Sequence, residues 1–274
     1  MNRSGAISAH IALIVLGVLF VIPLVWGISA SLHTNATIFL NPFQWLPSPA
    51  HWSNFGKAWS SQSFGLYMWN SFFIAFAITI FCVIFSQMAG YGLSQFKFFG
   101  RDVIFGTIVS TLLLPFPAIM VPVFIFTKDM GWINTFAGVI VPGIITAHAV
   151  FFMRQYLSGL PSELLWSARI DGASEWTVYW RIVVPLTGPV VAAVGVLTFV
   201  ASWNNLLWPL IVIQSKSHYT IPLGLSNFND TYFTNYVEMM AMSMVAVIPV
   251  ILLFLFVRRW LINSLMVSGG GIKG

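Results

Sequence analysis

Long apolar stretches alternate with short polar segments along the whole chain. A helix needs about 20 consecutive apolar residues to cross the hydrocarbon core of a bilayer. Stretches of about this length occupy residues 11–30, 71–92, 103–126, 137–153, 189–213 and 239–257. The pattern predicts an all-α integral membrane protein with six transmembrane helices. We expect one transmembrane domain, residues 1–274, whose six-helix core covers residues 9–260.

Composition agrees with the apolar pattern. Hydrophobic residue types make up 58% of the 274 residues and charged types only 7%, whereas soluble domains carry about 25% charged residues. Most of this surface must therefore face lipid. The first stretch is expected to stay as a span, because it is longer than the apolar region of a signal peptide and no A-x-A-like cleavage site follows it. The run L-P-F-P at residues 114–117, followed by Pro122, predicts a bent third helix.

The basic residues predict the orientation. With the N-terminus in the cytoplasm, only Lys57, Lys128 and Lys216 of the twelve Lys and Arg residues fall outside. The nine on the cytoplasmic side are Arg3, Lys97, Arg101, Arg154, Arg169, Arg181, Arg258, Arg259 and Lys273. The positive-inside rule therefore predicts that both termini are cytoplasmic, and it accounts for the net charge of +5. The tryptophans of the outside loop are expected to anchor at the headgroup level; they are Trp45, Trp52 and Trp59.

Several chemistries are absent from the sequence. None of the seven acidic residues lies in the middle of an apolar stretch, whereas an ion-coupled transporter normally needs a buried carboxylate or a similar relay. His148 is the one histidine within a stretch, and the single Cys82 has no partner for a disulfide. The chain has no H-E-x-x-H, G-x-S-x-G or G-x-x-x-x-G-K-[ST] pattern. We therefore expect no catalytic residues, no metal site and no ATP hydrolysis by this chain alone.

Residues 158–186, between the fourth and fifth stretches, are too charged to span a membrane and too aromatic for a plain linker. Pro161 suits the first position of a helix. Gly172 then turns the chain, and Ser174 can cap a second short helix that Pro185 limits. The segment predicts a helix, a turn and a helix. Its apolar surface must dock either under its own bundle or onto a partner protein.

The same segment resembles the cytoplasmic coupling loop of ABC importer permeases, described as E-A-A, three residues, glycine, nine residues, isoleucine and then L-P or similar. Gly172 is the glycine, Ile182 follows ten positions later and Pro185 ends the motif. Residues 168–174 reproduce A-R-I-D-G-A-S, which is characteristic of the carbohydrate-uptake branch, similar to the maltose and glycerol-phosphate systems. Residues 166–168 are W-S-A in place of E-A-A, so a contact of the motif glutamate does not carry over.

Two further runs carry the resemblance. Residues 203–210, W-N-N-L-L-W-P-L, resemble the W-N-x-x-L-W-P-L run in the fifth helix of that branch, and residues 268–274 resemble its S-G-A-V-K-G tail. No extended insertion separates the second and third stretches, so the chain resembles the shorter permease of a two-permease pair. The resemblance implies a type I importer fold in the bacterial inner membrane. It also implies the partners: a second homologous permease, two ATP-binding-cassette ATPases that hold ATP and Mg²⁺, and an extracellular solute-binding protein, with no cofactor on this chain and no nucleic acid.

The resemblance also implies a function, namely half of an alternating-access pathway for a sugar or sugar-like solute. The residues expected to couple to the ATPase are Ala168, Asp171, Gly172, Ala173, Trp176, Trp180, Ile182 and Pro185. Trp176 and Trp180 lie four residues apart and so share one helix face. Polar and aromatic residues expected along the solute pathway are Asn70, Gln87, Tyr91, Trp203, Asn204 and Asn205. Each of these can instead make an interhelical hydrogen bond.

Two other classes of protein stay open at this point. An ion-coupled secondary transporter would need no ATPase and would stop when its ion gradient collapses. A receptor-like or structural membrane protein would move no solute. The predicted coupling loop is the feature that separates these classes from an ABC permease.

Overall fold

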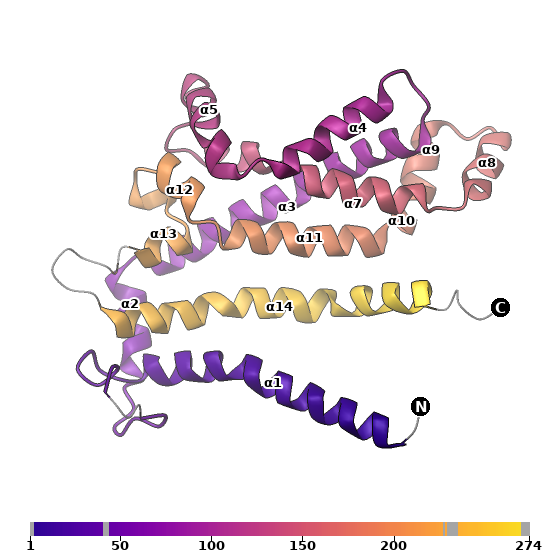
Figure 1. Cartoon of the computed structure of the whole chain (residues 1–274). Helices are drawn as coiled ribbons and strands as arrows, with labels where there is room; N and C mark the ends of the chain where they lie inside the picture. The colour runs from indigo at the N-terminus through magenta and orange to yellow at the C-terminus, as the bar shows by residue number, and fades with distance from the viewer. Residues whose placement is uncertain (1–2, 41–43, 227, 229–234, 270–274) are drawn as a thin grey trace. The chain divides into compact units, whose positions relative to one another are not determined.

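A computed structural model describes residues 3–40, 44–226, 228 and 235–269, with side chains for residues 7–40, 44–226, 228 and 235–258 (Figure 1). These residues form helices and no strand, which confirms the predicted all-α class. Residues 270–274, most of the predicted tail motif, lie outside the described part of the chain.

Four helices in the described residues are long and apolar enough to cross a membrane. They match the first, second, fourth and sixth predicted spans, and they cover Ile7–Ser31, Phe64–Gln95, Phe136–Ser158 and Tyr236–Arg258. Their elements are α1 (Arg3–Ser31), α3 (Phe64–Gln95), α6 (Phe136–Ile140) with η2 (Val141–Gly143) and α7 (Ala147–Ser158), and α14 (Tyr236–Gly269).

The third predicted span is a bent pair of helices, and a second bent pair joins the end of the predicted coupling loop to the fifth predicted span. Residues Arg101–Leu113, comprising α4 (Arg101–Ser110) and η1 (Thr111–Leu113), meet α5 (Phe116–Asp129) at 108°. Leu114 takes an extended backbone before Pro115, as a residue preceding proline prefers. The bend predicted from the prolines is confirmed. The described residues contain six spans if each bent pair forms one span.

The fifth predicted span differs from a single continuous helix. Residues Glu175–Leu186 meet α11 (Gly188–Trp203) at 73°, and α12 (Leu207–Val212) follows as a separate short helix. The apolar stretch predicted over residues 189–213 is therefore interrupted between Trp203 and Leu207. Asn204 and Asn205 separate α11 from α12, and asparagine competes with helical hydrogen bonding through its own side chain.

The chain divides into two compact units. Unit 1 consists of Met1–Met68 and Ile221–Pro249 and includes α2 (Ser53–Ser61) and α13 (Ile221–Ser226). Within it, the side-chain amide of Asn54 donates hydrogen bonds to the carbonyl oxygens of Ser31 and His33, at 2.9 and 2.8 Å. This bond pair ties α2 to the end of α1. The single domain predicted for residues 1–274 stays a prediction.

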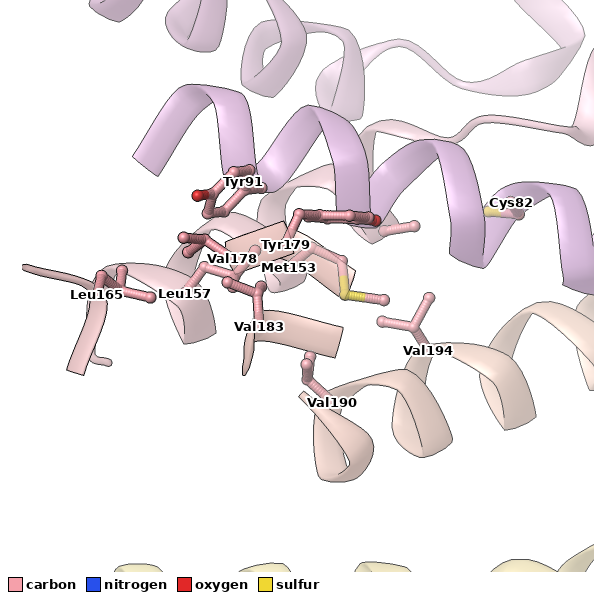
Figure 2. Close-up of a cluster of buried hydrophobic side chains, with 11 residues drawn as sticks. Cys82, Tyr91, Met153, Leu157, Leu165, Val178, Tyr179, Val183, Val190 and Val194 are labelled. Carbon is pink, nitrogen blue, oxygen red and sulfur yellow. The ribbon is translucent and has the colours of Figure 1, made fainter. Parts of the chain in front are cut away.

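Unit 2 consists of Trp69–Thr220 and Val250–Gly274 and carries all the predicted site residues. Within it, α7 contacts both α4 and α11. A buried cluster joins α3, α7 and α11 to residues 158–186 (Figure 2). Its members are Cys82, Tyr91, Ala149, Met153, Leu157, Leu165, Val178, Tyr179, Val183, Val190 and Val194. One side of the predicted coupling loop is thus part of the hydrophobic core.

Candidate functional site

Residues 158–186 fold as a helical hairpin at one end of α7 and α11 (Figure 1). The first arm is α8 (Ser162–Ile170); the second comprises α9 (Glu175–Val178), a π-helical turn η3 (Tyr179–Val183) and α10 (Val184–Leu186). The helix, turn and helix expected from the sequence are confirmed. Pro161 lies one residue before the first helical position, where it is the cap residue.

The turn of the hairpin depends on Gly172 and Ser174. Gly172 has φ +80°, in the left-handed region that glycine tolerates best. Apart from its chain neighbours, no heavy atom lies within 4 Å of the position that a Cβ would occupy there. The Ser174 hydroxyl accepts a hydrogen bond of 3.3 Å from the backbone N–H of Thr177, so the predicted cap is confirmed.

Pro185 does not end the second arm. Helical backbone continues through it to Leu186, and the chain bends at the next residue, Thr187. A proline ring collides with the carbonyl four residues earlier in an α-helix. Here that carbonyl belongs to Arg181, inside the wider π turn. The π turn makes room for the ring, which sequence reasoning did not anticipate.

The hairpin has an inner and an outer face. Leu165, Val178, Tyr179 and Val183 are buried in the core cluster, and three predicted coupling residues pack against that cluster: Ala168, Ala173 and Ile182. The other five predicted coupling residues are exposed; they are Asp171, Gly172, Trp176, Trp180 and Pro185.

We define the coupling surface as the exposed large apolar side chains of α8, α9 and η3 together with Gly172. The side chains are Leu164, Trp166, Ile170, Trp176 and Trp180, which expose 47%, 60%, 83%, 63% and 53% of their surface. Sequence reasoning missed the contribution of Ile170. Its spacing of four residues from Trp166 places both on one face of α8, which could have revealed it.

An ion pair joins the two arms of the hairpin. The Arg169 guanidinium donates from Nε to Oε1 of Glu175 at 2.7 Å and from a terminal nitrogen to Oε2 at 3.2 Å. This hydrogen bonding raises the pKa of Arg169. The hydroxyl of Tyr91 on α3 donates to Oε2 of the same carboxylate at 2.9 Å. Glu175 therefore connects both arms to a predicted membrane span.

Three predicted solute-pathway residues are buried and already hydrogen-bonded within unit 2. Tyr91 is one of them. The Asn70 amide donates to the carbonyl oxygens of Ser217 (2.9 Å) and Tyr219 (3.0 Å). The Gln87 amide donates to the hydroxyl of Thr187. These are the interhelical bonds that the sequence left open as the alternative, and a role of the three residues in solute contact stays a prediction.

The other three predicted pathway residues lie at the break between α11 and α12. Trp203 is buried and stacks on Phe199 with a centroid distance of 5.6 Å. Asn204 is exposed. Asn205 accepts a hydrogen bond of 3.3 Å from the backbone N–H of Trp208 and lines a cavity. The structure thus separates the two neighbouring asparagines.

The cavity has a volume of about 220 Å³ and lies where several helices of unit 2 break or begin. Its lining comprises Ile78, Phe116, Val139, Pro142, Gly143, Thr146, His148, Thr198, Ala201, Ser202, Asn205 and Trp208. These twelve residues include hydroxyl, amide and aromatic side chains and the imidazole of His148, but no Lys, Arg, Asp or Glu. The hydroxyls were not predicted, because single Ser and Thr residues are common inside membrane helices.

Comparison with known proteins gives consistent results. The model of the family "Binding-protein-dependent transport system inner membrane component" matches residues 82–266. The arabinooligosaccharides transport system permease protein AraQ of Bacillus subtilis is 41% identical over 208 residues, 76% of this chain and 73% of that protein. The sn-glycerol-3-phosphate transport system permease protein UgpE of Yersinia pestis is 33% identical over 276 residues, 97% of this chain and 98% of that protein.

A third relative and a solved structure agree. The lactose transport system permease protein LacG of Rhizobium radiobacter is 31% identical over 250 residues, 91% of each chain. A chain from the crystal structure of a bacterial ABC transporter for import of the acidic polysaccharide alginate superposes with a TM-score of 0.80 at 21% identity, covering 94% of this chain and 98% of that one. The fold is thus that of an ABC importer permease. This chain belongs to the family of inner-membrane components of binding-protein-dependent transport systems.

Proposed function

We propose that this chain is the permease subunit of an ATP-binding-cassette importer in which a partner ATPase supplies the energy. The coupling surface is the observation that carries the proposal. Its five large apolar side chains expose between 47% and 83% of their area, and Trp residues dominate the binding energy of many protein interfaces. Such a surface on a hairpin needs a partner, since the inner face already supplies the contact with the chain's own core.

The remaining subunits follow from the same proposal. A second homologous permease would complete the pathway, two ATPases would hold ATP and Mg²⁺, and an extracellular binding protein would deliver the solute. Movement of the ATPases at the coupling surface would favour one of two arrangements of the helices, which is the minimum that alternating access requires.

The solute that we propose is a neutral sugar or similar polyhydroxylated molecule. The cavity offers hydroxyl and amide groups and the imidazole of His148 as hydrogen-bonding partners and the aromatic rings of Phe116 and Trp208 as stacking surfaces, with no Lys, Arg, Asp or Glu in its lining. Lactose and arabino-oligosaccharides suit this lining better than the anionic sn-glycerol 3-phosphate, which would need a cation to replace its hydration. All three names come from relatives of this chain.

The proposal includes cytoplasmic termini, which place the coupling surface inside the cell. Single cysteines at Gly56 and Ile170, in a Cys82→Ala background, test this. Both native side-chain positions are exposed, so both cysteines should react in detergent. In intact cells, a membrane-impermeant thiol reagent should label only position 56. Labelling of position 170 from outside would contradict the orientation.

Purification of the assembled importer tests the function. The chain is co-expressed with its second permease and ATPase, and ATP hydrolysis is measured in proteoliposomes with and without loaded binding protein. We expect hydrolysis only when the ATPase is present, and stimulation by the loaded binding protein. Robust hydrolysis by this chain alone, or uptake that stops when an ion gradient collapses while ATP remains, would contradict an ABC permease.

A further inference from the structure

The Arg169–Glu175–Tyr91 contact is one end of a longer series of interactions inside unit 2. The Tyr91 ring packs against the Tyr179 ring with a centroid distance of 5.3 Å, and Figure 2 shows the two rings side by side beneath α3. The hydroxyl of Tyr179 donates to Oε1 of Gln87 at 3.4 Å. The Gln87 amide then donates to the hydroxyl of Thr187.

Thr187 is the residue at which the second arm of the hairpin bends by 73° into α11. It is fully buried, and its hydroxyl also donates to the carbonyl oxygens of Val183 (3.0 Å) and Val184 (2.9 Å). About one turn of α3 thus connects two points on the second arm of the hairpin: Tyr91 binds its start and Gln87 binds Thr187 at its end. If the hairpin moves, both contacts must either break or move α3 with it.

The coupling surface contacts the same series directly. The rings of Trp176 and Trp180 meet the Tyr179 ring edge to face, with centroid distances of 6.4 and 5.2 Å. A cavity of about 210 Å³ lies beside these rings and is lined by Tyr91, Glu175, Trp176 and Tyr179 among others. Close-packed interiors resist side-chain rearrangement, so free volume at this place allows the aromatic rings to change position when the coupling surface is pushed.

From these contacts we infer that Tyr91 and Gln87 are positioning residues for energy coupling rather than solute contacts. Together with Arg169, Glu175, Tyr179 and Thr187 they form what we call the coupling ladder. The ladder links the surface that meets the ATPase to α3 and to the bend before α11, so that both membrane helices follow the hairpin. This inference rests on the proposed function, because it presupposes a partner that moves the coupling surface.

Charge and burial explain why this link is strong enough to transmit movement. Hydrogen bonds to an ionised carboxylate are about twice as strong as those between neutral groups, and Glu175 accepts three of them. At the other end the Gln87 and Thr187 side chains are buried, where an unpaired amide or hydroxyl is costly. The buried end therefore cannot separate from α3 without a new partner, whereas water can reach the Glu175 carboxylate, whose side chain is 43% exposed.

The test removes only the hydroxyl of Tyr91, which bonds to Glu175. Tyr91→Phe keeps the ring that packs on Tyr179 and loses the bond to Glu175. The full importer with both permeases, its ATPase and its binding protein is reconstituted, and uptake of lactose or an arabino-oligosaccharide, whichever the wild type imports, is measured per ATP hydrolysed. We expect about a tenfold drop in this ratio, the effect of losing one hydrogen bond to a charged group, while the ATPase still co-purifies with the permease pair.

Two further variants make the result specific. Glu175→Ala should lower the ratio at least as far, because it removes the contacts with both Tyr91 and Arg169, and adding Tyr91→Phe to it should lower the ratio no further, because the tyrosine hydroxyl has already lost its partner. Tyr236→Phe is the matched control: it removes a tyrosine hydroxyl in unit 1, where the ring packs edge to face on Phe39, and should leave the ratio at the wild-type value.

Three outcomes would overturn the ladder. They are a wild-type ratio in Tyr91→Phe, additive losses in the double variant, and a raised KM for the sugar with an unchanged ratio, which would identify Tyr91 as a solute contact. If the wild-type chain itself retains no ATPase, the proposed function fails and the ladder fails with it. If the wild-type importer and the Tyr91→Phe variant both couple ATP hydrolysis to uptake normally, the coupling ladder is overturned and the proposed function stands.

Discussion

The hairpin and the cavity lined by Asn205 both belong to unit 2, but the polar groups of the two regions differ in charge. The hairpin holds an ion pair of 2.7 Å between Arg169 and Glu175, with a tyrosine hydroxyl on the same carboxylate. The polar groups that line the cavity are hydroxyls, one amide and the imidazole of His148, with no Lys, Arg, Asp or Glu. In the first region every polar group named has a partner from another segment of the chain. In the second, the hydroxyls of Thr146 and Thr198 border an open volume, and their partner from another segment is the weakly bonding sulfur of Cys82, at 3.5 and 3.8 Å.

This difference fits two separate tasks. Strong bonds between ionised groups hold a fixed geometry, which a part that transmits movement needs. Neutral hydroxyls and amides bind more weakly, and a passing solute can exchange them one by one without a deep energy minimum. Variants in the hairpin should therefore change how ATP hydrolysis is used, whereas variants in the cavity should change how solute is bound.

The largest effect is expected at the turn of the hairpin. In Gly172→Leu, the left-handed backbone costs about 1–2 kcal/mol and a bulky side chain enters the coupling surface. We expect loss of uptake and of ATPase attachment, with normal membrane insertion, measured by uptake and co-purification. Gly131→Leu is the control, because Gly131 also has a positive φ, +72°, and no heavy atom within 4 Å of its Cβ position. Normal uptake by Gly172→Leu would remove the main reason for assigning a coupling role.

The two exposed tryptophans should rank next. Trp176→Ala and Trp180→Ala should each weaken ATPase binding by about 2–4 kcal/mol if the indoles are interface hot spots, measured as the Kd of purified ATPase for the permease pair in lipid nanodiscs. Trp52→Ala, at a residue with 67% exposure in unit 1, is the control. Lower thermal stability with an unchanged Kd would show instead that the hairpin only packs on its own core.

A smaller and different effect is expected in the cavity. Ser202→Ala and Asn205→Ala should each raise the KM for the imported sugar by a factor of up to about ten, the effect of one lost hydrogen bond. Uptake per ATP hydrolysed should not change. A lower ratio without a change in KM would contradict the division of tasks between the two regions.

The smallest effect separates two neighbours that the sequence treated as a pair. Asn204 is exposed and does not line the cavity, so Asn204→Ala should change the free energy of unfolding by no more than about 0.5 kcal/mol. Asn205→Ala should cost more, because its side chain accepts the N–H of Trp208 and caps of this kind contribute about 0.5–2 kcal/mol. Thermal unfolding in detergent compares the two variants.

Local features of the chain could be predicted where one or two residues determine the conformation. Apolar length located four long helices, and the prolines around residue 115 predicted the 108° bend. Gly172 and Ser174 predicted the turn and the cap of the hairpin. Each of these depends on backbone preference or hydropathy over a short stretch, so the sequence contains all the necessary information.

Tertiary partners could not be predicted in the same way. Asn70, Gln87 and Tyr91 are buried polar residues in an apolar helix, which fits a solute pathway and an interhelical bond equally well. The structure supplies partners 147, 100 and 84 residues away along the chain. The cavity was also missed, because it is assembled from the ends of several helices and no one segment contains its pattern.

The direction in which the coupling surface faces depends on the number of residues in the π turn before Pro185. A π turn holds one more residue per hydrogen-bonded ring than an α turn, and each residue in an α-helix advances the direction of its side chain by about 100°. If the turn became α-helical with all five residues of Tyr179–Val183 kept, everything before it would rotate by about that angle relative to α11. Trp176 would then turn off the outer face with no change in its own neighbours in the sequence. The rotation of the second arm about its own axis, as much as the residue types on it, determines which side chains face a partner.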